Sequence, residues 1–337
     1  MAKTYLISLI SNHLLPNYLF IKEMAGKYDD LLFISTEKME DDGLGKRLEK
    51  ALGVKENAVQ QIVVSEENLN ETLAKLKSVP FSNDDRFMVN LTCGTKIMSI
   101  GVYEYFSKFI SSFYYIPIGK NKIENVGTSG EIPLNYRVNL EEYLTLYGIT
   151  FQSDRPLIYP QEHTFNLFER YKKNNFNRYR ILEILNAQNH TVESDKVYYS
   201  GGWFEEYCYL KIKQEKGLNN DCIYQSIKLF RNNSGLTNDN EIDVMYVSEN
   251  KLYVCECKVS LKGRPMVKDY ELLEQYMYKL AAISKDFGLI VNPYILTLHR
   301  FEKISPARKQ AIEKRMKILG IKDILNSNTF KQVKLNI

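Results

Sequence analysis

Two carboxylates and a lysine are spaced along EIDVMYVSENKLYVCECKVSL, residues 241–261, so that folding would bring them together. The segment has two runs of alternating β-branched and aromatic residues around a polar turn, which predicts a β-hairpin. A two-residue or a four-residue loop gives the same register, in which Val247 faces Leu252 and Asp243 faces Glu256. Side chains directly opposite on antiparallel strands lie about 5 Å apart at Cβ. The hairpin is therefore expected to hold two carboxylates face to face.

Two carboxylates at that separation repel each other unless a cation lies beside them. At an effective dielectric near 20 the repulsion amounts to roughly 3 kcal/mol. Lys258 follows Glu256 by two residues, so both project from one face of the strand. Carboxylate oxygens suit Mg²⁺ or Mn²⁺, and a lysine beside them can hold or deprotonate an attacking water. The pattern favours a divalent-metal site at Asp243 and Glu256; a surface salt bridge between Glu241 and Lys258 is the simpler alternative.

Composition and charge set bounds on the class of protein. With 337 residues, of which 44% are hydrophobic and 12% aromatic, the chain is long enough for about two domains with filled cores. It has no run of about 18 apolar residues, so no membrane span is expected. Five scattered cysteines without a Cys-x-x-Cys pair argue against a disulfide framework or a zinc ribbon and favour the cytoplasm. The net charge of +4 is only weak support for nucleic-acid binding.

The first half of the sequence alternates between strand and helix patterns, which predicts an α/β fold with a parallel sheet and helices on both faces. Such sheets bind ligands beyond the carboxyl ends of their strands, at the point where the strand order changes direction. The expected strands cover 5–11, 31–35, 61–65, 87–92 and 113–118, and the expected helices cover 16–27, 44–52, 66–78 and 95–110.

Polar loops follow three of these strands: SNHLLPN at 11–17, STEKME at 35–40 and TCGTK at 92–96. TCGTK follows a strand and opens a helix, so its backbone N–H groups form a natural phosphate cradle. It is neither a Walker A loop nor a dinucleotide-binding GxGxxG motif. Lys96 opposes the helix dipole in the first turn, which is explained if an anion binds there. An ordinary strand-to-helix turn with Lys96 in solvent is the alternative.

Two sets of motifs resemble known families. TCGTK after the fourth strand and SNHLLPN after the first resemble the CARF sensor domain of type III CRISPR systems, with Cys93 where that family commonly has glycine. GGWFEEY at 201–207, EIDV at 241–244 and ECK at 256–258, in that order, resemble the core of PD-(D/E)XK nucleases. Over nearly its whole length the chain resembles the cyclic-oligoadenylate-activated CRISPR ancillary nucleases of antiviral defence.

The resemblance implies an architecture and a set of ligands. A Rossmann-like CARF domain with a parallel sheet would span 1–145, a restriction-endonuclease-like α/β domain would span 191–337, and 146–190 would connect them. The activator would be a cyclic oligoadenylate, cyclic tetraadenylate in the first place, and the metal Mg²⁺ or Mn²⁺. A ring with two-fold symmetry fits best across a two-fold homodimer. The substrate would be single-stranded DNA or RNA, with duplex DNA as a further option.

The resemblance also implies roles for individual residues. Asp243 and Glu256 would bind the metal, with the backbone carbonyl of Cys257 as a third ligand, and Lys258 would position or activate water. The residues implied to contact the activator are Asn12, His13, Thr36, Thr92, Gly94, Thr95 and Lys96.

In the PD-(D/E)XK nucleases that the chain resembles, a helix upstream of the hairpin usually contributes one more glutamate to the site. The sequence offers Glu205 and Glu206 there. Position alone does not separate the two, whereas the family's spacing after tryptophan favours Glu205 as the catalytic one. On the helix expected at 272–282, Gln275 and Lys279 could face the site, but solvent exposure is expected for both.

Two other functions stay open at this point. A restriction- or repair-type nuclease without a second messenger would be fully active with no added nucleotide. A non-catalytic nucleotide-sensing regulator would only bind nucleic acid with its second half. The set of Asp243, Glu256 and Lys258 argues against the regulator, because a binding module has no need to place carboxylates near phosphate.

Overall fold

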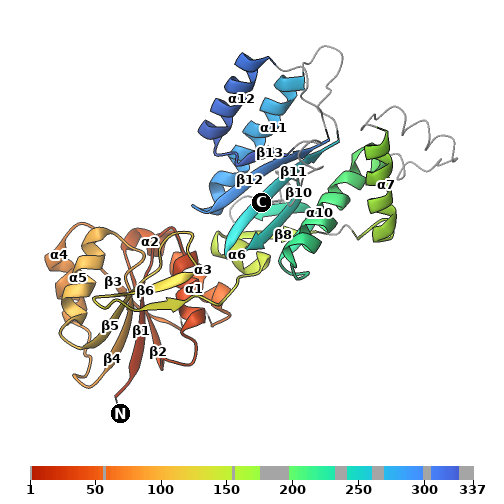
Figure 1. Cartoon of the computed structure of the whole chain (residues 1–337). Helices are drawn as coiled ribbons and strands as arrows, with labels where there is room; N and C mark the ends of the chain where they lie inside the picture. The colour runs from red at the N-terminus through yellow and green to blue at the C-terminus, as the bar shows by residue number, and fades with distance from the viewer. Residues whose placement is uncertain are drawn as a thin grey trace. The chain divides into compact units, whose positions relative to one another are not determined.

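The computed structural model describes residues 2–55, 58–153, 156–174, 197–231, 241–259, 269–298 and 305–325 (Figure 1). The chain forms two compact units, Met1–Ile149 and Thr150–Ile337. Each unit is built on one mixed β-sheet with helices packed against it. The predicted α/β fold class is confirmed for both halves.

In the first unit the described strands form a seven-stranded sheet in the order β3-β2-β1-β4-β5-β6-β7. The first five strands are parallel, as predicted, and two short antiparallel strands extend the sheet beyond β5. The strands are β1 (Thr4–Leu9), β2 (Asp30–Ser35), β3 (Gln60–Val63), β4 (Arg86–Asn90), β5 (Ile110–Tyr115), β6 (Lys122–Val126) and β7 (Glu131–Pro133).

Four helices of the first unit lie where the apolar periodicity predicted them. They are α1 (Leu15–Glu23), α3 (Leu44–Leu52), α4 (Leu69–Lys77) and α5 (Lys96–Phe106). A further helix, α6 (Leu140–Leu146), ends the unit. The segment expected as a polar loop at 35–40 instead begins a short helix, α2 (Glu37–Asp41). The Thr36 side chain accepts a hydrogen bond from the Met39 amide at 3.4 Å, which is N-capping that favours a helix there.

The strand order changes direction between β1 and β4. From β1 the chain proceeds outward through β2 and β3, then returns to β4 on the other side of β1 and continues to β5. Ser8 of β1 pairs with Asn90 of β4 near the carboxyl ends of both strands. The loops that follow β1 and β4 therefore leave the sheet next to each other, at the switch point where such sheets bind ligands.

In the second unit the strands described form a six-stranded sheet in the order β13-β12-β11-β10-β9-β8. Strand β10 is antiparallel to both β9 and β11, whereas β11, β12 and β13 run parallel. The strands are β8 (Ile149–Gln152), β9 (Ile223–Arg231), β10 (Glu241–Ser248), β11 (Lys251–Lys258), β12 (Val291–Thr297) and β13 (Asp323–Leu325).

Helix α10 (Trp203–Lys216) lies between the sheet and α7 (Gln161–Lys173) and contacts β9, β10 and β11 (Figure 1). Its aromatic residues stack on α7, with ring centroids 4.5 Å apart for Trp203 and Tyr171 and 4.1 Å for Tyr207 and Phe168. Thus β8 and α7, from the segment expected as a connector, belong to the sheet and core of the second unit. The rest of that segment from 175 onward lies outside the described residues.

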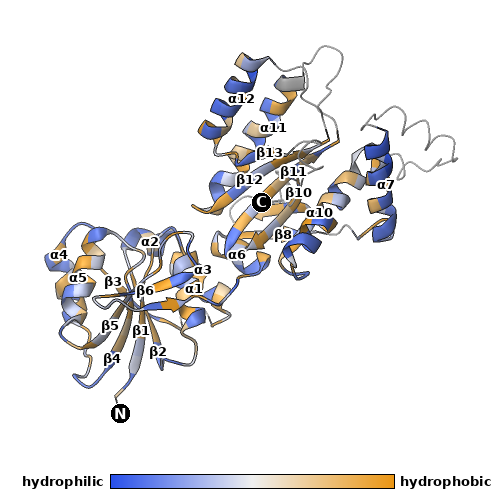
Figure 2. Ribbon diagram, in the orientation of Figure 1, coloured by the Kyte–Doolittle hydropathy of each residue, from blue (hydrophilic) through white to orange (hydrophobic). Residues whose placement is uncertain are grey.

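Two more helices complete the described part of the second unit, α11 (Asp269–Ser284) and α12 (Pro306–Leu319). Helix α11 contacts β11 and β12, and α12 packs on α11. Figure 2 shows apolar residues concentrated in the strands, while α12 is mostly hydrophilic; its buried residue is Ile312. No helix in the described ranges is both long enough and apolar enough to cross a membrane.

Candidate functional site

The predicted hairpin is formed by β10 and β11, in the predicted register. Val247 pairs with Leu252, and the last described pair is Val244 with Cys255. The chain reverses in the two-residue turn 249–250, where both residues have positive φ values of 51° and 59°, as a type I′ turn requires. One position beyond the last pair, Asp243 and Glu256 follow on facing strands.

Asp243 and Glu256 form a buried ionic cluster with Lys258. The two acidic residues are 8% and 2% exposed. Lys258 Nζ lies 2.8 Å from Asp243 Oδ2 and 2.9 Å from Glu256 Oε1, so it bridges both carboxylates. The backbone amide of Cys257 also donates to Asp243 Oδ2, at 2.6 Å. Lys258 is therefore part of an internal cluster, and a surface salt bridge to Glu241 does not describe it.

The pKa values of Asp243 and Lys258 are shifted by burial and by the charges of the cluster. Burial, followed by the negative charge of Glu256, raises the pKa of Asp243 from 3.8 to about 7. The charge of Glu205 raises this pKa further, while Lys258 lowers it. Burial by itself would lower the pKa of Lys258, but the two carboxylates outweigh it and hold that pKa well above its usual value. Lys258 therefore stays protonated while the carboxylates repel each other.

Two residues of α11, Tyr276 and Lys279, also contact the cluster. Lys279 Nζ lies 3.1 Å and 3.3 Å from the two carboxylate oxygens of Glu256. The ring of Tyr276 lies under Lys258, whose Nζ is 5.2 Å from the ring centroid. The Lys279 side chain is 36% exposed, as expected, yet its ammonium group also contacts Glu256; Gln275 is exposed as expected. The available signal was the i, i+3 spacing of Tyr276 and Lys279, which puts them on one helix face.

The two upstream glutamates have different surroundings. Glu206 is fully buried and accepts hydrogen bonds from Thr164, Tyr198 and the amide of Ile158. Glu205 is half-buried, and its charge acts on Asp243. The structure thus directs Glu206 away from the hairpin and leaves Glu205 within electrostatic reach of it.

The donors at the hairpin fit a hard divalent cation. Among the residues in the described ranges, no three or more His, Cys, Asp or Glu side chains gather as a ready metal site. Asp243 and Glu256 instead supply a pair of buried carboxylates, the oxygen ligands that Mg²⁺ and Mn²⁺ prefer. The Cys257 side chain packs in the core, but its N–H points to Asp243, and the N–H and C=O of one strand residue lie on the same side. Its carbonyl is therefore on the side of the cluster.

In the first unit, a chain of buried amides supports the loops at the switch point. Asn17 Nδ2 donates to the Leu9 carbonyl at 2.7 Å, and Asn90 Nδ2 donates to Asn17 Oδ1 at 3.1 Å. Asn90 Oδ1 accepts from the Thr92 amide at 3.1 Å and from its hydroxyl at 2.5 Å. The Thr92 hydroxyl oxygen also accepts from the Ile116 amide at 2.9 Å. Thr92 thus holds the start of the TCGTK loop against the sheet.

Three further candidate residues lie on the two loops themselves. Asn12 is exposed, and His13 is half-buried, with an Nδ1 that has no hydrogen-bond partner in the described part of the chain; burial lowers the pKa of His13. The Cys93 thiol donates to the His13 carbonyl at 3.3 Å, which joins the loops directly. Gly94 has φ of 82°, and a Cβ there would lie 3.2 Å from Leu9 Cβ, so the loop needs glycine at this position.

Thr95 and Lys96 form the start of α5. The Thr95 hydroxyl accepts a hydrogen bond from the Met98 amide at 3.2 Å and donates to the Glu66 carbonyl at 3.1 Å. Lys96 is exposed at the first position of the helix. Backbone N–H groups in the first turn of a helix lack intrahelical partners. An exposed lysine beside them makes this end of α5 suited to an anion.

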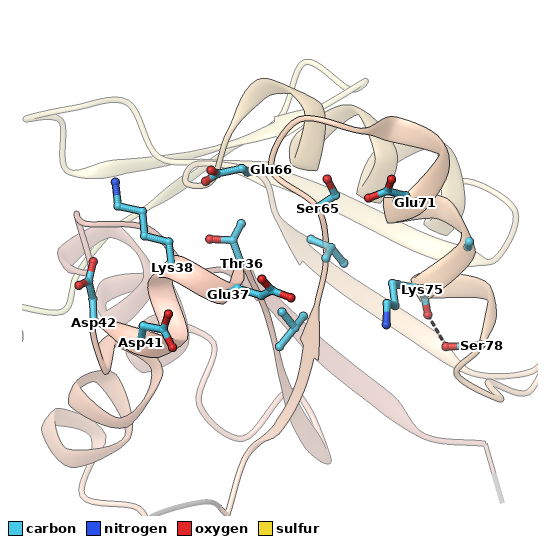
Figure 3. A pocket seen from close by; sticks show the side chains of 13 residues that line it. Thr36, Glu37, Lys38, Asp41, Asp42, Ser65, Glu66, Glu71, Lys75 and Ser78 are labelled. Carbon is cyan, nitrogen blue, oxygen red and sulfur yellow. Dashed lines mark hydrogen bonds between the residues drawn. The ribbon is translucent and has the colours of Figure 1, made fainter.

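A pocket of about 1040 Å³ opens at the carboxyl ends of β2 and β3 (Figure 3). Buried Thr36 is part of its lining, and α4 contributes the opposite side through Glu71 and Lys75. The charged residues that line the pocket are five carboxylates (Glu37, Asp41, Asp42, Glu66 and Glu71) and two lysines (Lys38 and Lys75). The pocket is therefore acidic, in contrast to the start of α5.

Comparison with known proteins gives two matches to family models. Residues 5–143 match the Card1 CARF domain, and residues 192–331 match the Card1-like endonuclease domain. No curated protein matches the sequence.

Similar solved structures cover nearly the whole chain. Can2 from Sulfobacillus thermosulfidooxidans, in complex with cyclic tetra-adenylate, is 19% identical with a TM-score of 0.70 over 98% of this chain and 96% of Can2. Protein VC1899 from Vibrio cholerae is 16% identical with a TM-score of 0.72 over 98% and 95%. A type III CRISPR defence DNA nuclease activated by cyclic oligoadenylate is 16% identical with a TM-score of 0.58, over 94% of this chain and 52% of that one. At these identities the likeness shows the fold.

The fold and the two model matches define a protein in which a CARF domain precedes an endonuclease domain. The two model matches follow each other in the order of the two units and together span most of the sequence. The chain belongs to the family that joins a Card1 CARF domain to a Card1-like endonuclease domain.

Proposed function

We propose that this protein is a metal-dependent nuclease that a cyclic oligoadenylate switches on. The observation that carries the proposal is the buried cluster in which Lys258 bridges Asp243 and Glu256 at 2.8 Å and 2.9 Å. Burying two carboxylates opposite each other costs stability and serves no packing purpose. A site that must bind a cation and act on a phosphodiester explains both the carboxylates and the lysine.

Within this proposal each residue of the cluster has a role. Asp243 and Glu256 would hold Mg²⁺ or Mn²⁺ together with the Cys257 carbonyl, and Glu205 would add a carboxylate from α10. When bound, the metal supplies a water of lowered pKa and neutralises charge on the phosphate. Lys258 stays protonated and donates hydrogen bonds that orient the attacking water and stabilise the developing negative charge.

The activator would bind at the switch point of the first unit. Lys96 and the amide of Gly94 offer donors to phosphate and ribose, Thr95 lies between them at the start of α5, and Asn12 and His13 form the facing wall. The Card1 CARF match and the structural likeness to Can2 in complex with cyclic tetra-adenylate support a cyclic oligoadenylate, with cyclic tetraadenylate as the first candidate. A two-fold symmetric ring would span a homodimer.

The pocket beside Thr36 would take a different part of the same ligand. Its surplus of carboxylates repels phosphate, but carboxylate oxygens accept hydrogen bonds from an exocyclic amine or a ribose hydroxyl. We therefore assign phosphate recognition to Lys96 and the start of α5, and base or ribose recognition to this pocket.

The substrates we propose are single-stranded DNA and RNA, with duplex DNA as a further one, in antiviral CRISPR defence in the cytoplasm. The sensor would comprise residues 1–145 and the nuclease residues 191–337. We infer that β8 and α7, which complete the sheet and core of the second unit, function with the nuclease.

One experiment tests the proposal as a whole. Labelled single-stranded DNA, single-stranded RNA and duplex DNA are incubated with Mg²⁺ or Mn²⁺, each with and without cyclic tri-, tetra- and hexa-adenylate. Cleavage that requires both metal and one of the rings supports the proposal. Full cleavage without any ring would indicate a restriction- or repair-type nuclease, and an absence of cleavage under every condition would indicate a regulator.

A further inference from the structure

Glu206 is a fully buried carboxylate one residue after Glu205, and it takes no part in the cluster at the hairpin. Its Oε1 accepts hydrogen bonds from the Thr164 hydroxyl at 2.5 Å and the Tyr198 hydroxyl at 3.1 Å. Its Oε2 accepts from the Ile158 amide at 3.1 Å. A buried carboxylate is costly unless such charge-assisted bonds satisfy it. We call Glu206 with these three donors the Glu206 knot.

The donors of the Glu206 knot come from three different segments. Ile158 lies in the stretch that leads into α7, Thr164 lies in the first half of α7, and Tyr198 lies in a π-helical turn, Tyr198–Gly202, that runs directly into α10. The knot therefore ties the first turns of α10 to α7 and to the turn that precedes α10.

The π-helical turn is what aligns Tyr198 with Glu206. In an uninterrupted α-helix, residues eight positions apart differ by about 80° around the axis. A π turn is wider, because its hydrogen bonds span five residues rather than four, so each residue advances by a smaller angle and the two side chains come to the same face. Such turns are rare and frequently occur at functional sites.

The same geometry fixes the direction of Glu205. Around α10, Glu206 lies about 100° to one side of Glu205, and Cys208 lies about 60° to the other side. Cys208 packs in the core that includes Cys255 and Cys257 of β11, and Glu206 is bonded to α7. Glu205 therefore lies between the face of α10 that packs on the sheet and the face that packs on α7.

We propose that Glu206, Tyr198 and Thr164 are positioning residues, which lock the rotation of α10 so that Glu205 is presented to Asp243. Stacked aromatic rings also hold α10 on α7, but stacking tolerates small rotations, whereas three directional hydrogen bonds to one buried carboxylate do not. The inference rests on the proposed function, because it gives Glu205 a part in the metal site.

The test compares single-hydroxyl variants with a neighbouring control. Tyr198→Phe and Thr164→Val each remove one donor, and Thr164→Ser keeps it. Tyr199→Phe is the control, since the Tyr199 hydroxyl contacts His163 Nε2, at 3.2 Å, outside the knot. Binding of Mn²⁺ is measured by calorimetry without nucleic acid, beside the melting temperature. We expect Tyr198→Phe and Thr164→Val to weaken Mn²⁺ binding by about tenfold, and Thr164→Ser and Tyr199→Phe to bind as wild type.

A double-mutant cycle separates positioning from a general loss of structure. In a Glu205→Gln background, Tyr198→Phe should have no further effect on Mn²⁺ binding, because the residue it positions is already gone. Equal effects in both backgrounds, or wild-type binding by both Tyr198→Phe and Thr164→Val, would overturn the inference. If Tyr198→Phe does not fold, the comparison of Thr164→Val with Thr164→Ser decides. Asp243→Asn tests the proposed function separately. If this variant binds Mn²⁺ as wild type does, Asp243 is not a metal ligand and the proposed metal site is wrong.

Discussion

The backbone amide of Cys257 donates a 2.6 Å hydrogen bond to the carboxylate of Asp243, across the open end of the hairpin. Nearer the turn, β10 and β11 pair regularly from Ser248 with Lys251 to Val244 with Cys255. Beyond that pair the Cys257 amide donates to a side-chain oxygen, Asp243 Oδ2, rather than to a backbone carbonyl. Asp243 is thus anchored by the backbone of the strand that carries the rest of the cluster, Glu256 and Lys258.

The first prediction concerns the three residues of the cluster. Asp243→Asn, Glu256→Gln and Lys258→Met should each reduce metal- and activator-dependent cleavage by at least about a thousandfold, since each removes a ligand or the cation at the reacting phosphate. Cleavage of labelled DNA and RNA provides the measurement. Lys251→Met, at the turn end of the same hairpin, is the matched control and should cleave as wild type. Variants of the cluster that cut at the wild-type rate would show that it is structural.

The second prediction concerns pH and uses metal-free protein. The raised pKa of Asp243, about 7 against an ordinary 3.8, means that the native state binds more protons than the unfolded state between these values. The free energy of unfolding should therefore fall as pH rises through this window, by at most roughly 4 kcal/mol from this group, and stay low above it.

Asp243→Asn removes the titrating group, so it should flatten that decline. In the presence of a metal chelator, the variant should melt at a higher temperature than wild type at pH 8. The difference in melting temperature should shrink towards pH 5. Melting curves at unit steps of pH provide the measurement. A stability difference that is independent of pH would contradict the proton linkage.

The hairpin and the parallel sheet could be predicted because their signals are local. The register of β10 and β11 follows from residue alternation and turn length alone, and Val247 faces Leu252 as predicted. Strands β1 to β5 are apolar runs bounded by polar turns. Strand β7 has three residues, none of them buried, and α2 has five residues, so neither carries a periodic apolar pattern.

The rest of the cluster could not be predicted, because it depends on contacts between distant segments. Lys279 reaches Glu256 only because α11 packs on β11 and β12. Glu206 is buried by donors that lie 8, 42 and 48 positions away in the sequence. An adjacent Glu-Glu pair on a helix gives no sign that one member is satisfied internally while the other faces a site.

The third prediction tests Lys279. Lys279→Gln removes an ammonium group 3.1 Å from Glu256, which should let that carboxylate move and remove a positive charge from the substrate side. We expect cleavage to fall about tenfold, and Lys279→Arg to restore most of it, because a charge-assisted bond is kept. Exposed Lys285, just beyond α11, supplies the control: Lys285→Gln should cleave normally. A wild-type rate for Lys279→Gln at both low and high salt would restrict Lys279 to a structural role.

The fourth prediction compares the two glutamates of α10 by separate measurements. Glu205→Gln should lower cleavage strongly and leave the melting temperature unchanged, because Glu205 is half-buried and in our proposal binds the metal. Glu206→Ala should lower the free energy of unfolding by about 1–3 kcal/mol, because it strands buried donors of Thr164, Tyr198 and Ile158. The reverse pattern would place Glu206 at the site and the helix about 100° from the orientation described.

The last prediction tests activation by the cyclic oligoadenylate, which distinguishes this proposal from a restriction- or repair-type nuclease. Lys96→Glu places a negative charge at the exposed start of α5, where the phosphates of the ring would bind beside N–H groups that favour anions. Ring binding, measured by calorimetry, should weaken at least about a hundredfold, and activation should move to correspondingly higher ring concentration, because a ligand shifts an equilibrium only through its differential affinity. Binding of Mn²⁺ and ring-independent cleavage should not change, since Lys96 is in the sensor unit. Lys108→Glu makes the same charge change just past the other end of α5 and should respond to the ring as wild type. Normal ring-stimulated cleavage by Lys96→Glu would show that the start of α5 does not bind the activator. A wild-type protein that no ring activates would show that the nuclease is not regulated by a cyclic oligoadenylate.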